Sequence, residues 1–199
     1  MENAVWIPHI EEESSAGIRE VSLFTKLLTD RKVFINGAID SDMANLIAMQ
    51  LMHLESTSKE AVTIYINSTG GEVQAGLLIY DVIQGMKIPV NICCTGRACS
   101  MAAILLAGGQ KGRRYILPHA KTMIHEPLIY NGVGGSATSI KNISDSILET
   151  KRLVNSILVK HTGKAEEEID VATSFDNYMN ATESIEFGLC DKVVESMLI

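Results

Sequence analysis

From about residue 30 onward, two kinds of segment alternate along this chain, and this alternation constrains the fold more than any other feature. Short runs rich in β-branched residues, such as 32–36 (KVFIN) and 62–67 (VTIYIN), are followed by longer segments whose apolar residues recur three and four positions apart. Such alternation indicates an α/β fold. Further strands are expected at 90–95, 114–117, 122–125 and 189–194.

Three of the intervening segments predict buried helices. Residues 43–54 and 73–86 carry apolar residues on more than one face, as crossover helices packed on a sheet do. The segment after Ser100 (MAAILLA) is apolar on almost all sides, so we expect it to be buried. With 199 residues, 46% of them hydrophobic, the chain can form one core without a disulfide or a metal.

A fourth helical segment is unusually long. From about Ser139 to His161 the apolar spacing predicts one helix of about 23 residues, ended by Thr162-Gly163. At 1.5 Å per residue it would be about 35 Å long, more than a domain of this size needs for its own core, so we expect it to project toward a partner. The Gly-rich stretch before it, Asn131–Ser136, predicts a loop rather than a phosphate-binding turn, because no strand leads directly into it.

The first twenty residues are acidic and predict an arm or loop, with a weak helix beginning near Ile18. The formal charge of -7 argues against nucleic acid or an anionic membrane as the main partner, because phosphate binding needs a basic face. No apolar run reaches the length of a membrane span, and the N-terminus lacks the basic and apolar regions of a secretory signal. We therefore expect a cytoplasmic protein.

The cysteines predict no chemistry. They are too few and too clustered for a disulfide framework, and they form no CxxC pair for zinc. We expect all of them to be buried, reduced thiols: Cys93, Cys94, Cys99 and Cys190.

The stretch 95–103 (TGRACSMAA) is the most informative about chemistry. It places Ser100 where a strand opens into a buried helix, at the sheet edge where α/β proteins bind ligands. The dipole of the helix favours negative charge there, and the N–H of Met101 is available to an oxyanion. From this stretch alone, the simpler interpretation is favoured, namely that Ser100 only caps the helix.

A second strand, in 64–73 (IYINSTGGEV), also runs into a glycine turn before a helix. Two glycines permit unusual backbone angles and bring N–H groups close to a ligand. An ordinary turn between strand and helix is the alternative. Two such turns on adjacent strands would form a two-sided oxyanion site.

A nucleophilic serine needs a base, and His125 ranks first among the five histidines. It ends a short strand, and Glu126-Pro127 then breaks the strand so that the imidazole can face a cleft. The other histidines lie in the arm, within an apolar helical pattern, in a turn and at a helix end: His9, His53, His119 and His161. The residues leave open which aspartate orients the base, the candidates being Asp145, Asp170, Asp176 and Asp191.

Several motifs, in order along nearly the whole chain, resemble those of the ClpP family, the proteolytic subunits of the Clp protease. They are 65–71 (YINSTGG), 96–101 (GRACSM), 111–115 (KGRRY), 123–127 (MIHEP), 161–163 (HTG), 176–181 (DNYMNA) and 186–191 (EFGLCD).

The resemblance implies a single domain with three parts. These are an N-terminal arm or axial-pore loop at 1–20, a crotonase-like α/β head of repeated ββα units at 21–127 and 163–199, and a handle loop and helix at 128–162. It further implies heptameric rings stacked into a tetradecamer around a chamber, fed by an AAA+ unfoldase such as ClpX, ClpA or ClpC. ATP is used by the unfoldase, and neither a cofactor nor a metal is expected in this chain.

The resemblance also assigns roles to residues. Ser100 is the nucleophile, His125 the general base and Asp176 its orienting partner in a serine endopeptidase that acts by acyl transfer. The oxyanion N–H groups come from Gly71 and Met101. Unfolded polypeptides would bind extended, as an added β-strand, beside 71–73, which includes Val73, and beside Leu128.

The chain departs from the family pattern at several informative positions. Phe175 stands where most relatives have an arginine that pairs with acidic groups across the contact between rings, and Ser139 and Lys141 stand where those acidic groups are expected. This contact is therefore either simply more apolar, or too weak to align the triad without a second isoform or an unfoldase. Glu126 replaces the usual glutamine after the base, and its side chain is expected to point away from the imidazole.

Two other classes of function remain open. A crotonase-type acyl-CoA enzyme shares the fold and the paired oxyanion amides but moves protons with carboxylates. A non-catalytic ring subunit would supply only architecture and unfoldase docking.

Overall fold

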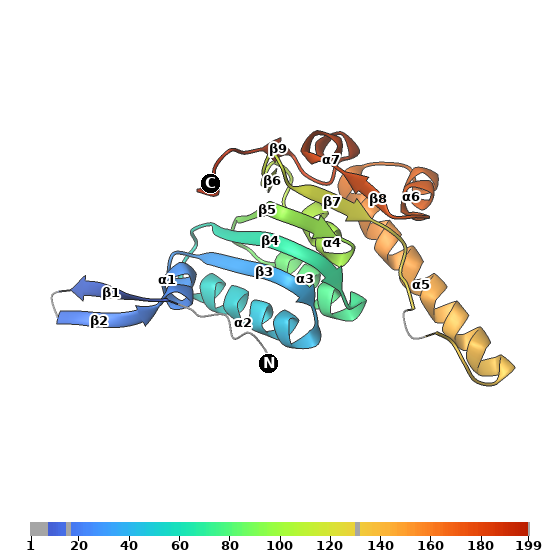
Figure 1. The fold of residues 1–199 in the computed structure, drawn as a ribbon, viewed down its shortest axis with the longest axis horizontal. Helices are drawn as coiled ribbons and strands as arrows, with labels where there is room; N and C mark the ends of the chain where they lie inside the picture. The colour runs from blue at the N-terminus through green and yellow to red at the C-terminus, as the bar shows by residue number, and fades with distance from the viewer. Residues whose placement is uncertain (1–7, 15–16, 130–131, 199) are drawn as a thin grey trace.

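The computed structural model describes residues 8–14, 17–129 and 132–198. Its first half contains β1 (His9–Ser14), β2 (Gly17–Ser22), α1 (Leu23–Thr29), β3 (Lys32–Ile39), α2 (Ser41–Thr57), β4 (Val62–Gly71), α3 (Val73–Gly85), β5 (Val90–Cys99) and α4 (Met101–Ala107). Its second half contains β6 (Arg114–Ile116), β7 (Lys121–Ile124), α5 (Ala137–Thr162), α6 (Glu166–Thr173), β8 (Asn177–Met179), α7 (Ala181–Phe187) and β9 (Lys192–Val193) (Figure 1).

The head is built on a mostly parallel sheet, which confirms the predicted α/β class. Strands β3, β4, β5, β6 and β9 lie side by side in this order, each parallel to its neighbour. Strand β7 runs parallel to the last part of β5, and β8 is antiparallel to β7. Helices cover the face of the sheet below β3 and β4 in Figure 1. The three expected helices and the first five expected strands are present, with bounds shifted by a few residues.

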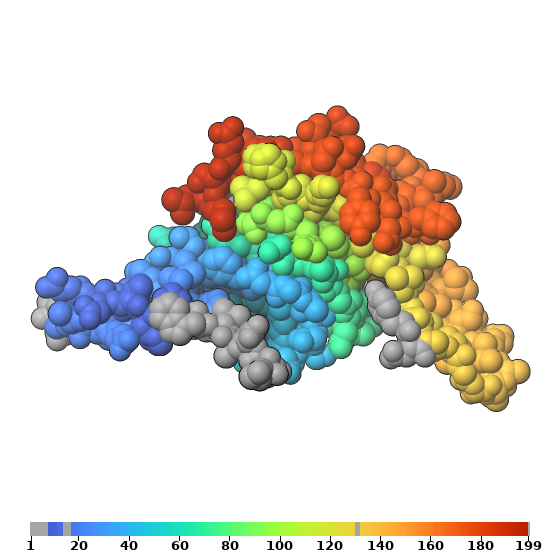
Figure 2. Space-filling view, in the orientation of Figure 1, coloured from blue at the N-terminus to red at the C-terminus, as the bar shows by residue number. Residues whose placement is uncertain are grey.

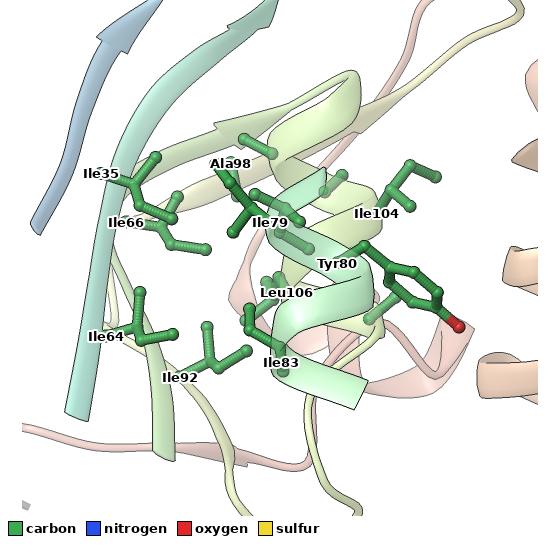
Figure 3. Packing of buried hydrophobic residues seen from close by; sticks show 14 of the residues in the cluster. Ile35, Ile64, Ile66, Ile79, Tyr80, Ile83, Ile92, Ala98, Ile104 and Leu106 are labelled. Carbon is green, nitrogen blue, oxygen red and sulfur yellow. The ribbon is translucent and has the colours of Figure 1, made fainter. Parts of the chain in front are cut away.

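The core lies between this sheet and helices α3 and α4. Isoleucines from the strands interlock with Ile79 and Ile83 of α3 and with Leu106 of α4 (Figure 3). All seven residues of α4 are buried, as its apolar sequence predicts. Burying a side chain of this size contributes about 1.5–3 kcal/mol, so this packing fixes the strand–helix junctions at the sheet edge.

The long helix α5 is present and leaves the head. Ser136 caps its first turn, and Gly163, at φ 77°, ends it in the left-handed conformation. Its buried residues fall in one short stretch near the C-terminal end, Val154–Leu158, whereas Ile140, Ile143 and Leu148 are exposed. Figure 2 shows α5 extending from one side of the head and the β1–β2 hairpin from the opposite side.

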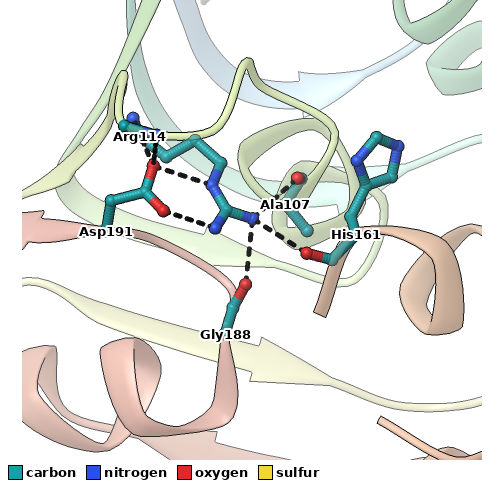
Figure 4. A network of polar contacts seen from close by, with 6 residues as sticks. Ala107, Arg114, His161, Gly188 and Asp191 are labelled. Atoms are coloured by element: carbon teal, nitrogen blue, oxygen red, sulfur yellow. Dashed lines mark hydrogen bonds and ion pairs between the residues drawn. The ribbon is translucent and has the colours of Figure 1, made fainter. Parts of the chain in front are cut away.

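Arg114 ties the base of α5 to the head (Figure 4). Its guanidinium is almost completely buried and pairs with Asp191 through two hydrogen bonds, of 3.0 and 2.5 Å. One of its nitrogens also donates to the carbonyl oxygens of Ala107, His161 and Gly188. Burial alone would raise the pKa of Asp191, but the hydrogen bonds and the charge of Arg114, together with a hydrogen bond from the Gly112 N–H, outweigh the burial and lower it. One cation therefore joins the ends of α4, α5 and α7.

The four cysteines are buried and free, as predicted. Burial raises the pKa of the Cys93 thiol to about 11 and those of Cys94 and Cys190 to about 12. Thiols with such pKa values are protonated at neutral pH and are therefore weak nucleophiles.

The arm differs from the expectation. Instead of a loop and a helix near Ile18, the described residues form an antiparallel hairpin in which Ile18 pairs with Glu13 and the cross-strand partners Glu12 and Arg19 form an ion pair. The helix begins only at Leu23, where the Ser22 side chain accepts a hydrogen bond from the Thr25 N–H. Residues 1–7 and 15–16 of the expected arm, and Asn131 of the expected loop, lie outside the described residues.

Three elements near the C-terminus were not expected, namely α6, β8 and α7. The strand expected at 189–194 is reduced to β9, two residues long, because the Leu189 N–H donates to the Ser184 carbonyl oxygen of α7 and the pairing with β6 begins only at Lys192.

Candidate active site

Strand β5 brings the candidate nucleophile to the candidate base by changing its partner. Its residues Ile92–Cys94 pair with β6, whereas Arg97–Cys99 pair with β7. Ser100 follows directly, and its N–H donates to the carbonyl oxygen of Met123, 2.8 Å away. The end of β5 is thereby fixed beside the end of β7, where His125 follows Ile124.

Ser100 has the backbone conformation of a sharp turn between strand and helix. Its φ of 54° and ψ of -127° lie in a region that non-glycine residues rarely adopt, and such strain is maintained only by rigid surroundings. Its side chain makes no capping hydrogen bond to α4, so the interpretation that Ser100 only caps the helix is wrong. Its Oγ instead lies 2.9 Å from Nε2 of His125.

The antiparallel pairing of β7 with β8 brings Asp176 to the other side of the imidazole. Ile124 is the register partner of Asn177, so the residues that follow and precede them, His125 and Asp176, are also neighbours. Asp176 Oδ1 lies 3.4 Å from His125 Nδ1, which is slightly longer than a normal hydrogen bond. The His125 side chain is 10% exposed and that of Asp176 is 56% exposed.

The structure also shows why the other aspartates do not meet the base. Asp145 pairs with Lys141 on the exposed part of α5, and Asp170 accepts a hydrogen bond from Asn155. Asp191 is held by Arg114.

The two glycines of the first turn are required for different reasons. Gly70 has φ +86°, and a Cβ on it would lie 2.5 Å from the carbonyl oxygen of Cys99 and 3.1 Å from the nitrogen of Met101. A Cβ on Gly71 would lie 2.0 Å from the carbonyl oxygen of Ile39. The turn is therefore packed tightly against the start of α4, and the backbones of Gly71 and Met101 lie at the same edge of the sheet.

A small pocket adjoins Ser100, and a larger groove lies next to this pocket. The first is a pocket of about 20 Å³ whose walls include Ser100, His125, Val73 and Ile104. The second is an open groove of about 590 Å³ between the start of α3, residues 127–129 and α5. Val73 and Leu128 both line this groove, and Val73 and Pro127 also line the small pocket that contains Ser100.

The surroundings of Asp176 are exposed and apolar. Phe175 is 84% exposed, and Val171 and Tyr178 are also exposed. The ring of Phe175 therefore packs little against the rest of this chain.

Three residues near the site were missed or only partly recognised in the sequence. The need for glycine at position 70 depends on tertiary packing against Ser100, although the Gly70-Gly71 pair itself is a visible signal. The side chain of Glu126 pairs with Lys151, and the Glu126 N–H donates to the carbonyl oxygen of Thr173. No sequence signal identifies Lys151, because its role depends on how α5 docks on the head.

In the described ranges, no cluster of three or more His, Cys, Asp or Glu side chains could hold a metal ion. No helix in the same part of the chain is both long and apolar enough to cross a membrane.

The sequence also matches a known protein family. The family model described as Clp protease covers residues 14–197, which is most of the chain. This range includes both glycine turns and the three residues Ser100, His125 and Asp176.

Proposed function

The chain belongs to the Clp protease family, and from this premise we propose that it is a ClpP-type serine endopeptidase that cleaves unfolded polypeptides into short peptides. One observation carries the proposal. A serine with a strained backbone, a histidine and an aspartate lie in line at the ends of β5, β7 and the loop before β8. Serine peptidases on unrelated folds use this constellation.

The proposed reaction is acyl transfer. His125 Nε2 takes the proton from Ser100 Oγ as this oxygen attacks the carbonyl carbon of the scissile peptide bond. Asp176 faces Nδ1 and stabilises the imidazolium that forms. His125 then gives its proton to the leaving amine. A water molecule, deprotonated by the same imidazole, attacks the acyl-enzyme and releases the second product.

The negative charge on the carbonyl oxygen needs donors that are already in place. We assign this role to the N–H groups of Gly71 and Met101, which lie where the glycine turn packs against the start of α4. Losing one such donor typically costs about 10²–10³-fold in kcat. The peptide would lie extended in the groove lined by Val73 and Leu128.

We further propose that the chain assembles into stacked heptameric rings that receive unfolded chains from an AAA+ unfoldase of the ClpX, ClpA or ClpC kind. In support, large apolar side chains are exposed on two separate surfaces, one on α2 and one on the projecting part of α5. They are Leu46, Met49 and Met52 on α2, and Ile140, Ile143 and Leu148 on α5. Contiguous apolar surface of this kind is typical of protein contacts.

A narrower possibility is favoured by the exposed surroundings of Asp176. The carboxylate is half-exposed, and its neighbour Phe175 offers no charge to fix it. The isolated chain would then be weakly active, and a second isoform or an unfoldase would align the triad. Sedimentation together with a peptidase assay tests this: a stable tetradecamer with full activity on its own contradicts it.

The main test is the Ser100→Ala variant. We expect it to lose hydrolysis of a fluorogenic peptide and labelling by a fluorophosphonate, with an unchanged melting temperature. Ser56→Ala on α2, whose hydroxyl bonds only the His53 carbonyl oxygen among the described contacts, is the matched control and should keep both activities. Retained turnover in the Ser100→Ala variant would overturn the proposal.

The same assay separates the two rival functions. An acyl-CoA enzyme would resist the fluorophosphonate and bind coenzyme A tightly. A non-catalytic subunit would neither hydrolyse peptide nor react with the fluorophosphonate on its own, and in a mixture with a co-expressed homologue its Ser100 would remain unlabelled.

A further inference from the structure

Glu126 connects the base to the long helix. It follows His125 directly, and one of its carboxylate oxygens lies 2.7 Å from Nζ of Lys151 on α5. The two side chains are only 39% and 27% exposed. Lys151 also lies one turn before Val154, where the buried part of α5 begins.

Glu126 is held from a second direction by its backbone. Its N–H donates to the carbonyl oxygen of Thr173, 2.8 Å away, at the end of α6. Thr173 precedes Asp176 by three residues. One residue therefore contacts both the helix that projects from the head and the segment that carries the carboxylate of the triad.

His125 lies just outside regular secondary structure. Strand β7 ends at Ile124, and Pro127 has no N–H to donate. The contacts of Glu126 are thus the nearest polar restraints on the chain after the imidazole. The hydrogen bond to Glu126 raises the pKa of the Lys151 ammonium group, and the charge of Asp170 adds a smaller effect in the same direction.

We propose that Glu126 and Lys151 are positioning residues, which couple the placement of α5 to the alignment of His125 between Ser100 and Asp176. The proposal rests on the peptidase function proposed above. When α5 is seated, the ion pair holds residues 125–127 so that the imidazole reaches both partners. When α5 shifts, the same pair pulls on the residue next to the base.

The test is a double-mutant cycle on kcat, using Glu126→Ala, Lys151→Met and the double variant. Misplacement of a catalytic group lowers the rate of the chemical step, so each single variant should lose kcat about tenfold, with KM changed less than about twofold. Because both residues act through one contact, the double variant should be no slower than either single variant. Exchanging the charges in Glu126→Lys/Lys151→Glu should restore kcat to within about threefold of the wild type.

A second ion pair provides the matched control. Lys164 pairs with Glu168 at the start of α6 and is about as exposed as Lys151, but it lies far along the chain from residues 125–127. Glu168→Gln should leave kcat and KM unchanged. Because partly exposed pairs contribute little to stability, the melting temperatures of all these variants should stay close to that of the wild type.

Three results would overturn the inference: unchanged kcat in both single variants, multiplicative losses in the double variant, or a charge exchange that restores nothing. These results differ from a failure of the proposed function, in which wild-type protein would neither hydrolyse peptide nor react with the fluorophosphonate.

Discussion

The imidazole of His125 lies between two very different regions of the molecule. On one side, Ser100 lies between the fully buried helix α4 and strands β5 and β7, with its N–H bonded to Met123. On the other side, Asp176 lies in the short loop between α6 and β8, half-exposed, with Phe175 and Tyr178 pointing into solvent.

This difference separates the buried centre of the head, which holds Ser100, from its periphery, which holds Asp176. The nucleophile and the glycine turn are fixed by core packing that a single chain completes. The carboxylate of Asp176 depends on peripheral elements, of which α6 packs against α5. Local stability in proteins falls with fewer buried contacts, so the carboxylate side is the one that moves more easily.

The largest expected effect compares His125→Ala with Asp176→Ala. We expect about a 10⁵–10⁶-fold loss of kcat/KM for the histidine variant, but only about 10²–10³-fold for the aspartate variant, because the Asp176 carboxylate is half-exposed and lies 3.4 Å from Nδ1 of His125. Steady-state peptide hydrolysis and the rate of fluorophosphonate labelling measure both. Equal losses would show that the two sides of the imidazole are held equally well.

Arg114→Met tests the junction between the two regions. It should lower the free energy of unfolding by about 3–5 kcal/mol, since Asp191 and three carbonyl oxygens lose their shared cation in a buried position. Denaturant unfolding measures this. Arg19→Met, which removes an exposed ion pair in the hairpin, is the control and should cost less than about 1 kcal/mol. A loss below about 1 kcal/mol for Arg114→Met would mean that this junction is not an anchor.

His161 makes the same junction sensitive to pH. Its Nε2 lies 2.8 Å from the hydroxyl oxygen of Tyr80, and burial, with help from Lys160 and Arg114, lowers the pKa of its imidazole below 6.5. Below about pH 6.5 the unfolded chain therefore binds more protons at His161 than the folded chain does. The contribution of the neutral imidazole to the free energy of unfolding is complete above that pH and is lost as the pH falls through the folded-state pKa.

Melting temperatures at pH 7.5 and 5.5 should accordingly differ more for the wild type than for His161→Gln. His53→Gln, on the exposed face of α2, should behave as the wild type does. The same pH dependence in the His161→Gln variant would assign the effect to other groups.

The smallest effect is expected at Phe175. Phe175→Ser should change the free energy of unfolding of the monomer by less than about 0.5 kcal/mol, because the ring is almost fully exposed. Leu105→Ala in the buried helix α4 should cost about 2–5 kcal/mol by comparison. A large loss for Phe175→Ser would show that the carboxylate side is packed after all, whereas a change in sedimentation alone would place Phe175 in a subunit contact.

The sequence predicts the strands and helices at the centre of the head well, because the sequence signals for these elements are local. The strands and helices around Ser100 follow from hydrophobic spacing, and His125 follows from the strand break before Pro127. Local signals for some missed elements were also present. Asn180 and Glu183 form a capping box at the start of α7, and three glutamates occupy the first turn of α6, where they suit the helix dipole.

Other features depend on contacts that no local pattern contains. Four aspartates were equivalent candidates until the pairing of β7 with β8 brought Asp176 to His125, and only the family resemblance singled it out beforehand. The hairpin was missed because glutamates disfavour strands, although Glu12 and Arg19 compensate each other across it. The partner of Glu126 is set by the docking of a helix that begins more than ten residues later.

Helix α5 is buried against the head only near its C-terminal end, so a small rotation there produces a large displacement at its N-terminal end. About 17 residues separate Ala137 from the buried stretch that begins at Val154, a length of roughly 25 Å at 1.5 Å per residue. A rotation of about 10° about the anchored end would move the tip by roughly 4 Å but would displace Lys151, three residues from Val154, by only about 0.8 Å. A large movement at the tip is thus converted into a small adjustment beside the base, and a catalytic hydrogen bond tolerates only adjustments of that size.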